Sequence, residues 1–213
     1  LGKSFPNELE KANDFLDSKE LKELLDSTYK FKGDIETPAR LIAKFLQDCQ
    51  LADKVLIDFK EHLRIVGPGG NLRQTHRVPA HRDSFYSLPK EGINFWIPCT
   101  DAPFGVSVYP QLFKTHLRVG KIDPATRHHK IIEPDLSSEP KINLGCDFGY
   151  TFLFSGDHLH GSTINESNRT RISWDYRLVL TEAIRPGLRI GDFINADLMI
   201  DESYNRELAL KQT

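Results

Sequence analysis

The 213-residue chain has few cysteines, no long hydrophobic run and no strong excess of charge, and each absence excludes a class of protein. The three cysteines, Cys49, Cys99 and Cys146, are far apart and form no CxxC pair, which favours reduced buried thiols over disulfides or a zinc site. No apolar stretch is long enough to span a bilayer, and no apolar signal segment opens the chain. We therefore expect a cytoplasmic protein without a membrane partner.

The charge of the chain does not favour a nucleic-acid partner. Its formal net charge is -2 and its pI is near 6.5, and the 28 Lys and Arg residues form no basic block. The glycine-rich stretch at 67–70 lacks the GxxxxGK pattern of a phosphate loop and predicts a turn. With 39% apolar residues, the chain has the composition of an ordinary globular domain with a sizeable core.

The first part of the chain has a helical pattern. Apolar residues recur there at helical spacing, and Thr37-Pro38 is typical of an N-cap followed by a first-turn proline. The apolar stripe that follows consists of Leu41, Ile42, Phe45 and Leu46. We predict that residues 1–55 form helices that brace one face of a sheet.

The rest of the chain has the pattern of a β protein. Short apolar runs separated by turns lie at 55–57, 63–66, 93–97, 105–109, 150–154 and 171–180. Without a long helix between them, these runs predict an antiparallel sandwich or barrel. Residues 114–143 are polar and contain prolines, which predicts a long loop over the barrel mouth. We assign 1–213 to a single domain, with the barrel core at 56–185 and a C-terminal extension at 186–213.

Two histidines and one carboxylate form the most informative motif of the chain. On an extended segment, His81 and Asp83 would point to the same side, because strand side chains alternate. A distant strand would supply His160. Two imidazoles and one carboxylate can cover one face of an octahedral metal and leave three positions open, as non-haem Fe(II) enzymes require. The motif therefore predicts a metal site.

An arginine follows His160 at a spacing that could bring its side chain close to the metal site. Ten residues separate His160 from Arg171, which is room for a strand end, a turn and a return strand. The forked guanidinium would suit the far carboxylate of a metal-chelating dicarboxylate. His158 with Arg169 offers the same spacing, so a second register is open. We favour the first, because His160 begins a His-Gly-Ser run and Arg171 opens an apolar strand.

Taken together, these residues resemble the Fe(II)/2-oxoglutarate-dependent dioxygenases, and most closely the phytanoyl-CoA dioxygenase-like branch. The resemblance is carried by His81-Arg82-Asp83, Asn94-Phe95-Trp96-Ile97-Pro98, the block from Gly105 to His116, and His160-Gly161-Ser162 with Asn165 and Arg171. It implies a double-stranded β-helix, a jelly-roll or cupin-like barrel, mainly β with flanking N-terminal helices. It also implies Fe(II), with 2-oxoglutarate and O2 as co-substrates.

The resemblance further implies roles for single residues. The iron ligands would be His81, Asp83 and His160, and Arg171 with Ser162 would clamp the distal carboxylate of 2-oxoglutarate. The carboxylate of Asp83 argues against a halogenase, because those relatives have a small residue there. The run from Gln111 to His116 departs from the Gly-Ser-His ending that relatives usually carry, on the substrate side of the site.

Other polar residues are candidates for substrate or co-substrate contacts. Asn94 could bond the co-substrate or the substrate, and Trp96, on the same strand face, could either pack in the core or contact the substrate. Arg177 shares the face of Arg171, where it would either pair with Asp175 at the rim or bind a substrate anion.

Residues that flank the His-x-Asp triplet are candidates for the mouth of the site. Gln74, His76 and Tyr86 belong to this group. We expect His128 and His129 to be loop residues and not metal ligands.

The sequence thus predicts an enzyme, an Fe(II)- and 2-oxoglutarate-dependent oxygenase. We expect it to hydroxylate a small polar metabolite or a biosynthetic intermediate and to release succinate and CO2. Two alternatives are a cupin-type metal enzyme that does not use 2-oxoglutarate and a non-catalytic binding barrel. The complete triad and Arg171 argue against both.

Overall fold

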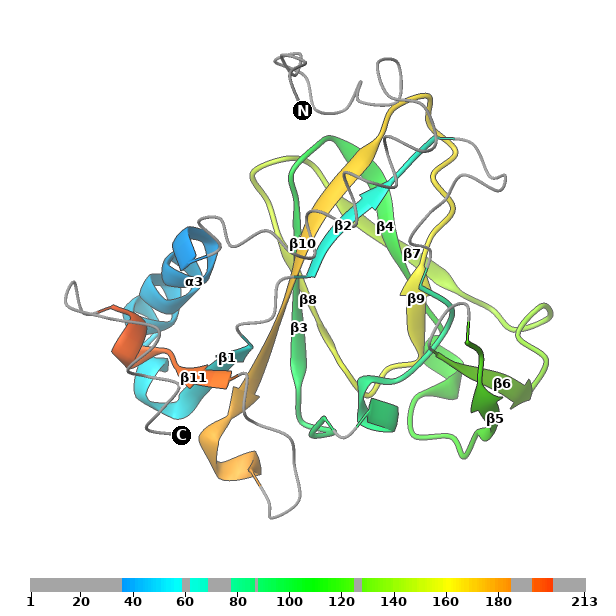
Figure 1. The fold of residues 1–213 in the computed structure, drawn as a ribbon, viewed down its shortest axis with the longest axis horizontal. Coiled ribbons are helices and arrows are strands. Elements are labelled where there is room, and N and C mark those ends of the chain that lie inside the picture. Colours follow the sequence, from blue (N-terminus) through cyan, green and yellow to red (C-terminus); the bar gives the residue numbers. More distant parts are fainter. Residues whose placement is uncertain are drawn as a thin grey trace.

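The protein is described by a computed structural model, which covers residues 36–58, 62–68, 78–86, 88–124, 128–184 and 193–200. Two antiparallel sheets face each other, and the helix α3 (Glu36–Asp48) lies outside the larger one (Figure 1). The strands are β1 (Val55–Asp58), β2 (His62–Val66), β3 (Ile93–Pro98), β4 (Ala102–Val108), β5 (Arg118–Ile122), β6 (His129–Glu133), β7 (Ile142–Cys146), β8 (Phe152–Ser155), β9 (His160–Ser162), β10 (Arg171–Leu180) and β11 (Phe193–Asn195). Short 3₁₀ helices lie at Ala52–Lys54, Asp83–Tyr86, Pro110–Leu112, Thr181–Ala183 and Asp197–Met199.

The long strand β10 is the centre of the six-stranded sheet. It pairs with β3 on one side, and on the other with β2 along its first half and β1 along its second half. β11 pairs with the outer side of β1, and β8 with the outer side of β3. Because side chains alternate along a strand, Tyr176 and Leu178 join the core under α3, while Asp175 and Arg177 line a cavity inside the barrel.

The outer face of this sheet is closed by α3. Ala39, Ile42, Ala43 and Leu46 recur at helical spacing and are buried against the sheet. Burial of a side chain the size of Ile or Leu stabilises a fold by roughly 1.5–3 kcal/mol. The helix therefore fixes the back of the strands whose other face builds the site.

Two details of the predicted helix are wrong. Leu41 and Phe45 are 65% and 50% exposed, because the buried stripe runs through the two alanines instead. The helix begins at Glu36, so Thr37 lies inside it and is not the N-cap.

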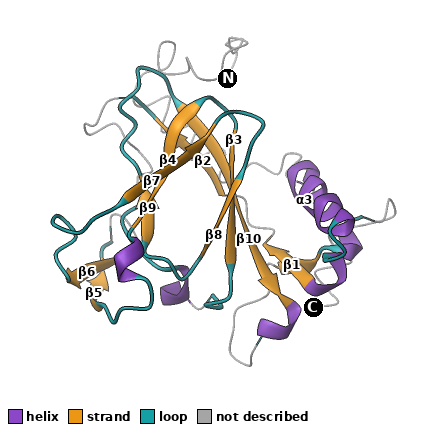
Figure 2. Ribbon diagram, turned by 180° about the vertical axis from the view of Figure 1, so that it is seen from behind, coloured by secondary structure: helices purple, strands orange, loops and turns teal. Residues whose placement is uncertain are grey.

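The smaller sheet has the strand order β7-β4-β9 and faces the larger one (Figure 2). Trp96 of β3 is buried, stacks on Phe152 with ring centroids 4.9 Å apart, and packs with Val106 and Val108 of β4. A Cβ atom on Gly105 would lie 2.1 Å from the Trp96 ring, so only glycine lets the two sheets approach here. This apolar layer closes the barrel beside the candidate site.

The predicted fold class is confirmed, mainly β with two facing antiparallel sheets and a bracing helix. The other predicted helices, before residue 36, lie outside the described residues. Within the described ranges, no helix is long and apolar enough to cross a membrane. The cytoplasmic location stays a prediction.

The segment 114–143 differs from the predicted long loop. It contains a hairpin, in which β5 and β6 pair antiparallel, and the last residues of the segment begin β7. Val119 and Ile122 are 38% and 51% exposed, so backbone pairing, with little burial, builds this hairpin. The predicted C-terminal extension also contains a strand, β11, that pairs with β1.

Candidate metal centre

A backbone bridge between distant segments brings the two predicted histidine ligands together. The His81 N–H donates to the His160 carbonyl at 2.8 Å, and the His160 N–H donates to the His81 carbonyl at 2.9 Å. In such an antiparallel pair, side chains directly opposite each other point to the same side. The imidazole centroids are accordingly 4.4 Å apart. A Cβ on Gly161 would come within 3.0 Å of the backbone at Val78 and Ala80, so this close approach requires glycine.

Both imidazoles are oriented through one ring nitrogen. Nδ1 of His81 lies 2.9 Å from the Pro79 carbonyl, and Nδ1 of His160 lies 2.8 Å from the His158 carbonyl. A carbonyl only accepts hydrogen bonds, so each Nδ1 carries the proton. In the neutral form of each ring, Nε2 then has a free lone pair. This arrangement is the one in which histidines bind metals.

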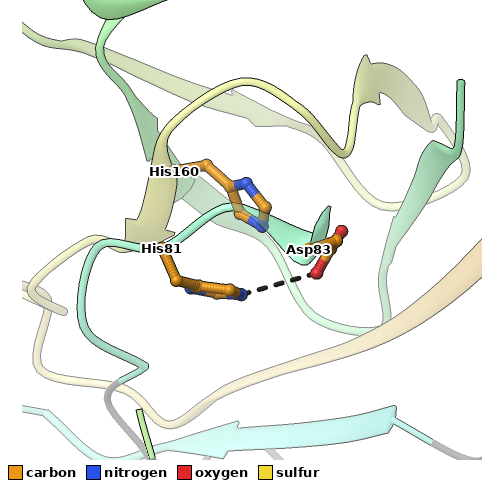
Figure 3. Close-up of side chains that lie close together, drawn as sticks. All are labelled: His81, Asp83 and His160. Carbon is orange, nitrogen blue, oxygen red and sulfur yellow. Dashed lines mark ion pairs between the residues drawn. The ribbon is translucent and has the colours of Figure 1, made fainter. Parts of the chain in front are cut away.

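The carboxylate of Asp83 completes the group. Asp83 opens the 3₁₀ helix Asp83–Tyr86, so the triplet is a bridge followed by a tight turn and not the predicted extended segment. Its Oδ1 lies 3.5 Å from His81 Nε2. Figure 3 marks this ion pair with a dashed line. Asn94 Nδ2 donates to Oδ2 at 2.8 Å, and Arg177 Nη2 donates to Oδ1 at 3.1 Å.

The charges of this group suit a bound cation. Burial would raise the pKa of Asp83, but Arg177 and the two imidazoles outweigh it and hold that pKa well below its ordinary value. Burial, and then the neighbouring His81, lowers the pKa of His160 to about 3. Near neutral pH the site therefore presents one carboxylate and a neutral His160 imidazole.

The three side chains fit a metal ion. His81, Asp83 and His160 are all buried and each offers a ligand atom, and these atoms lie within 4.8 Å of one another. Unshared electron pairs on two Nε2 atoms and a carboxylate oxygen converge there, which is unfavourable unless a cation lies between them. Imidazole and carboxylate donors suit iron and similar divalent metals.

Several contacts fix the segment that carries the first two candidate ligands. Arg82 points away from them, and its Nη2 donates to the carbonyls of Leu112 and Thr115. The Asp83 N–H donates to the Gly156 carbonyl at 2.9 Å. A Cβ on Gly156 would lie 2.9 Å from Asp83 Oδ2, so a glycine at this position leaves room for the Asp83 carboxylate.

A cavity of about 40 Å³ lies next to His81 and His160. This is room for roughly three water molecules, so a five-carbon dicarboxylate would require side chains to move. The wall is polar on one side and apolar on the other. It is lined by Arg64, Val78, Asn94, Phe95, Trp96, Val106, Phe154, Ser162, Asp175 and Arg177 in addition to the histidines.

The predicted clamp residues are only partly at this cavity. Ser162 lines it, although its Oγ accepts a hydrogen bond from the Val78 N–H at 3.2 Å. Arg171 is buried and does not line it; its Nη1 and Nη2 donate to Oγ1 and the carbonyl of Thr163, at 2.8 and 3.2 Å. The Arg171 guanidinium therefore contacts Thr163, the residue that follows Ser162, the other residue of the predicted clamp. Burial lowers the pKa of Arg171 to about 10, which leaves it charged.

The structure gives Asn94 and Arg177 other contacts than those predicted. Asn94 donates to the carboxylate of Asp83, so it holds a candidate metal ligand. The predicted Arg177–Asp175 pair is wrong: Arg177 contacts Asp83 and Asp58, and Asp175 pairs with Arg64 at 2.7 Å. The register explains the exchange, because Arg64 lies opposite Ser173 and reaches the next residue on that face.

The hairpin approaches the mouth of the site. The Tyr86 ring is 5.8 Å from the His81 ring, and its hydroxyl accepts a hydrogen bond from the His129 N–H at 3.0 Å. The His128 ring centroid is 4.8 Å from that of His81. Of the two histidines predicted to lie in a loop, His129 instead begins β6. Trp96 packs in the apolar layer and also lines the cavity.

The remaining predicted residues lie apart from the triad or outside the described part. The His158 ring stacks on Phe113 at 4.4 Å and does not join His81 and Asp83. Arg169 is exposed in the turn before β10. Asn165 Nδ2 donates across that turn to the Arg169 carbonyl, and it also donates to the carbonyl of Val66 in β2. Gln74 and His76 lie outside the described residues.

Sequence reasoning missed three residues that contact this site. Asp58 and Arg64 come from β1 and β2, more than 100 positions before their partners on β10. No short motif marks such pairs, since strand register decides them. Gly156 could have been suspected, because it precedes the His-x-His segment in a turn.

No protein-family model and no curated protein matches the sequence. Among solved structures, EvdO2 from Micromonospora carbonacea var. aurantiaca, complexed with 2-oxoglutarate, is 18% identical with a TM-score of 0.48, over 79% of this chain and 68% of that one. The epimerase SnoN from nogalamycin biosynthesis, in complex with Fe3+, alpha ketoglutarate and nogalamycin RO, is 15% identical with a TM-score of 0.46, over 66% and 55%. The non-heme monooxygenase ThoJ is 14% identical with a TM-score of 0.43, over 65% and 51%.

This chain spans about half the length of ThoJ and of SnoN. At these identities and TM-scores, the likeness gives no conclusion about the family, substrate or reaction of this chain. The phytanoyl-CoA dioxygenase-like branch stays a prediction. The function proposed below rests on the side chains of the site.

Proposed function

We propose that the protein is an Fe(II)- and 2-oxoglutarate-dependent oxygenase that acts on a small polar molecule. One observation carries the proposal: His81, Asp83 and His160 are buried with their ligand atoms within 4.8 Å of one another. Both imidazoles are fixed through Nδ1 so that their Nε2 atoms are available, and two imidazoles with one carboxylate leave open positions for a co-substrate and oxygen.

In this proposal, His81, Asp83 and His160 hold the iron. When bound, iron supplies the redox chemistry, in which O2 is activated as 2-oxoglutarate is decarboxylated to succinate. Asn94 orients the carboxylate of Asp83 through the hydrogen bond that it donates to Oδ2, and Arg177 contacts the other oxygen. Trp96 and Phe154 form the apolar side of the cavity and exclude water there.

The co-substrate would bind on the side of Ser162 and Arg171. The buried Arg171 remains charged, and its contact with Thr163 holds it beside Ser162. A dicarboxylate can form a two-pronged pair with such a guanidinium. Hydroxylation of a C–H bond is the outcome that we propose for the substrate.

Anaerobic titration with 2-oxoglutarate, with and without Fe(II), tests this function. We expect binding only when Fe(II) is present, because the keto acid chelates the metal, and succinate release once oxygen is admitted. Fe(II) binding without any 2-oxoglutarate binding or succinate would contradict the proposal.

A cupin-type metal enzyme that does not use 2-oxoglutarate is the second candidate. It is favoured by the position of Arg171, which does not line the small cavity beside the triad. The same titration separates the two candidates, since this one predicts metal binding with no response to the keto acid.

A further inference from the structure

A row of three polar side chains crosses the large sheet behind Asp83. Arg177 of β10 lies opposite Asn94 of β3 in the strand register, and Asp58 of β1 follows Ile57, which pairs with Leu178. Asn94 and Arg177 both donate to Asp83. Asp58, at the far end of the row, is 3% exposed and contacts neither candidate histidine ligand in the hydrogen bonds and ion pairs described.

One guanidinium in this row is divided between two buried carboxylates. Arg177 Nη1 lies 3.4 Å from Asp58 Oδ2, while Nη2 lies 3.1 Å from Asp83 Oδ1. An arginine guanidinium stays protonated in proteins. The cation is therefore permanently charged, and Asp58 takes one of its two terminal nitrogens away from Asp83.

The removal of Asp58 would change this balance. An arginine that faces one carboxylate tends to form a two-pronged pair with it. Such a pair on Asp83 would occupy oxygen lone pairs that a metal needs. The charges of Asp58, Arg177 and Asp83 also sum to minus one. Without Asp58 they would sum to zero, and the site would then attract a divalent cation less.

We propose that Asp58 is a positioning residue for the metal site. Asp58 shares the guanidinium of Arg177 with Asp83, and this sharing keeps the guanidinium from neutralising the metal-binding carboxylate of Asp83. The inference rests on the metal-binding half of the proposed function and is independent of 2-oxoglutarate. It gives the buried Asp58 a role that its place in the outer part of the sheet does not suggest.

Anaerobic Fe(II) affinity, measured without keto acid, tests the inference in a double-mutant cycle. Asp58→Asn should weaken Fe(II) binding by about tenfold or more, the range known for residues that support metal ligands. Asp58→Asn combined with Arg177→Met should return to within about threefold of the wild type, under roughly 0.7 kcal/mol, because the buried net charge is again minus one. Asp58→Glu keeps the charge and should also stay near the wild type.

The outcomes separate this role from a merely structural one. Wild-type affinity in Asp58→Asn would overturn the inference while leaving the proposed function intact. A double variant as weak as the single one would also overturn it, since removal of the competing cation should rescue binding. If Asp58→Asn does not fold, the double variant decides alone, and a tenfold loss in it would contradict the inference. A wild-type protein that binds no Fe(II) would refute the inference and the proposed function together.

Discussion

The metal triad and the co-substrate side of the barrel differ in how far their side chains are preorganised before a ligand binds. Around His81, Asp83 and His160, the backbone bridge, the fixed Nδ1 atoms and the donors to the carboxylate leave little freedom. On the other side, the cavity measures about 40 Å³, and the Arg64–Asp175 ion pair lies in its wall. The metal half is therefore preorganised, while we expect the co-substrate half to rearrange when a ligand enters.

The largest expected effect is the loss of a distal ligand. His160→Ala should weaken Fe(II) binding by more than about 100-fold, because even residues that only support ligands cost 10–100-fold, and succinate formation should disappear. His158→Ala is the matched control, since its ring stacks on Phe113. Isothermal titration with Fe(II) measures both. A severe loss in His158→Ala with normal binding in His160→Ala would reverse the assignment of the distal ligand.

The next largest effect concerns the co-substrate side of the barrel. Arg171→Ala should weaken 2-oxoglutarate binding at saturating Fe(II) by at least about tenfold, since a charge-assisted bond contributes roughly 1.5–3 kcal/mol. Arg171→Lys should recover only part of the affinity, because an ammonium lacks the fork. Arg169→Ala is the control, because Arg169 is exposed in the turn. Equal affinity in all three variants would favour the cupin-type candidate.

Substitution of a glycine beside the metal triad should weaken Fe(II) binding less than loss of a ligand does. In Gly156→Ala the new Cβ would lie 2.9 Å from Asp83 Oδ2, so the carboxylate must shift. We expect Fe(II) affinity to fall by about tenfold, the lower end of the range for residues that support metal ligands. Gly149→Ala controls for stability alone, since its φ of 88° is strained while no atom lies within 4 Å of the added Cβ. Equal affinity losses in the two variants would show that strain, and not the carboxylate, is responsible.

The metal triad should also make the stability of the metal-free protein depend on pH. The pKa of His160 is about 3 in the folded protein and near 6.5 when unfolded, so below pH 6.5 the unfolded chain binds a proton that the folded chain does not. Stability should fall as the pH drops from about 6.5 towards 3, by up to roughly 1.4 kcal/mol per unit. The lowered pKa of Asp83 adds a further loss below about pH 4.

Urea unfolding at several pH values, with a chelator present, measures this dependence. His160→Gln removes the titrating ring and should flatten the curve between about pH 6.5 and 4. A slope in the variant as steep as in the wild type would show that other groups control the acid response.

The smallest expected effect concerns the hairpin. Tyr86→Phe removes the hydroxyl that accepts the His129 N–H, a bond worth about 0.5–1.5 kcal/mol. The His129 amide should exchange faster with solvent, which hydrogen exchange followed by NMR detects, while Fe(II) affinity stays within about threefold, under roughly 0.7 kcal/mol. Unchanged exchange of that amide would mean that the hydroxyl does not hold the hairpin.

The same contrast explains what the sequence could predict. The clustering of His81, Asp83 and His160 could be predicted, because residue types and their order along the chain can be read directly from the sequence. The partners of Arg177 could not be found, because they depend on which residue of β1 and β3 lies opposite it, and strand register is not readable from one sequence. The hairpin was missed because Val119 and Ile131 give too weak an alternation among polar residues.

Anaerobic equilibrium dialysis with Fe(II) tests the central claim most directly, on the wild type and on Asp83→Ala. The triad predicts one tightly bound Fe(II) per wild-type chain and loss of that ion when the carboxylate is removed. Circular dichroism of Asp83→Ala should show that the barrel is intact. A wild-type chain without bound Fe(II), or an Asp83→Ala chain that binds it equally well, would contradict the account.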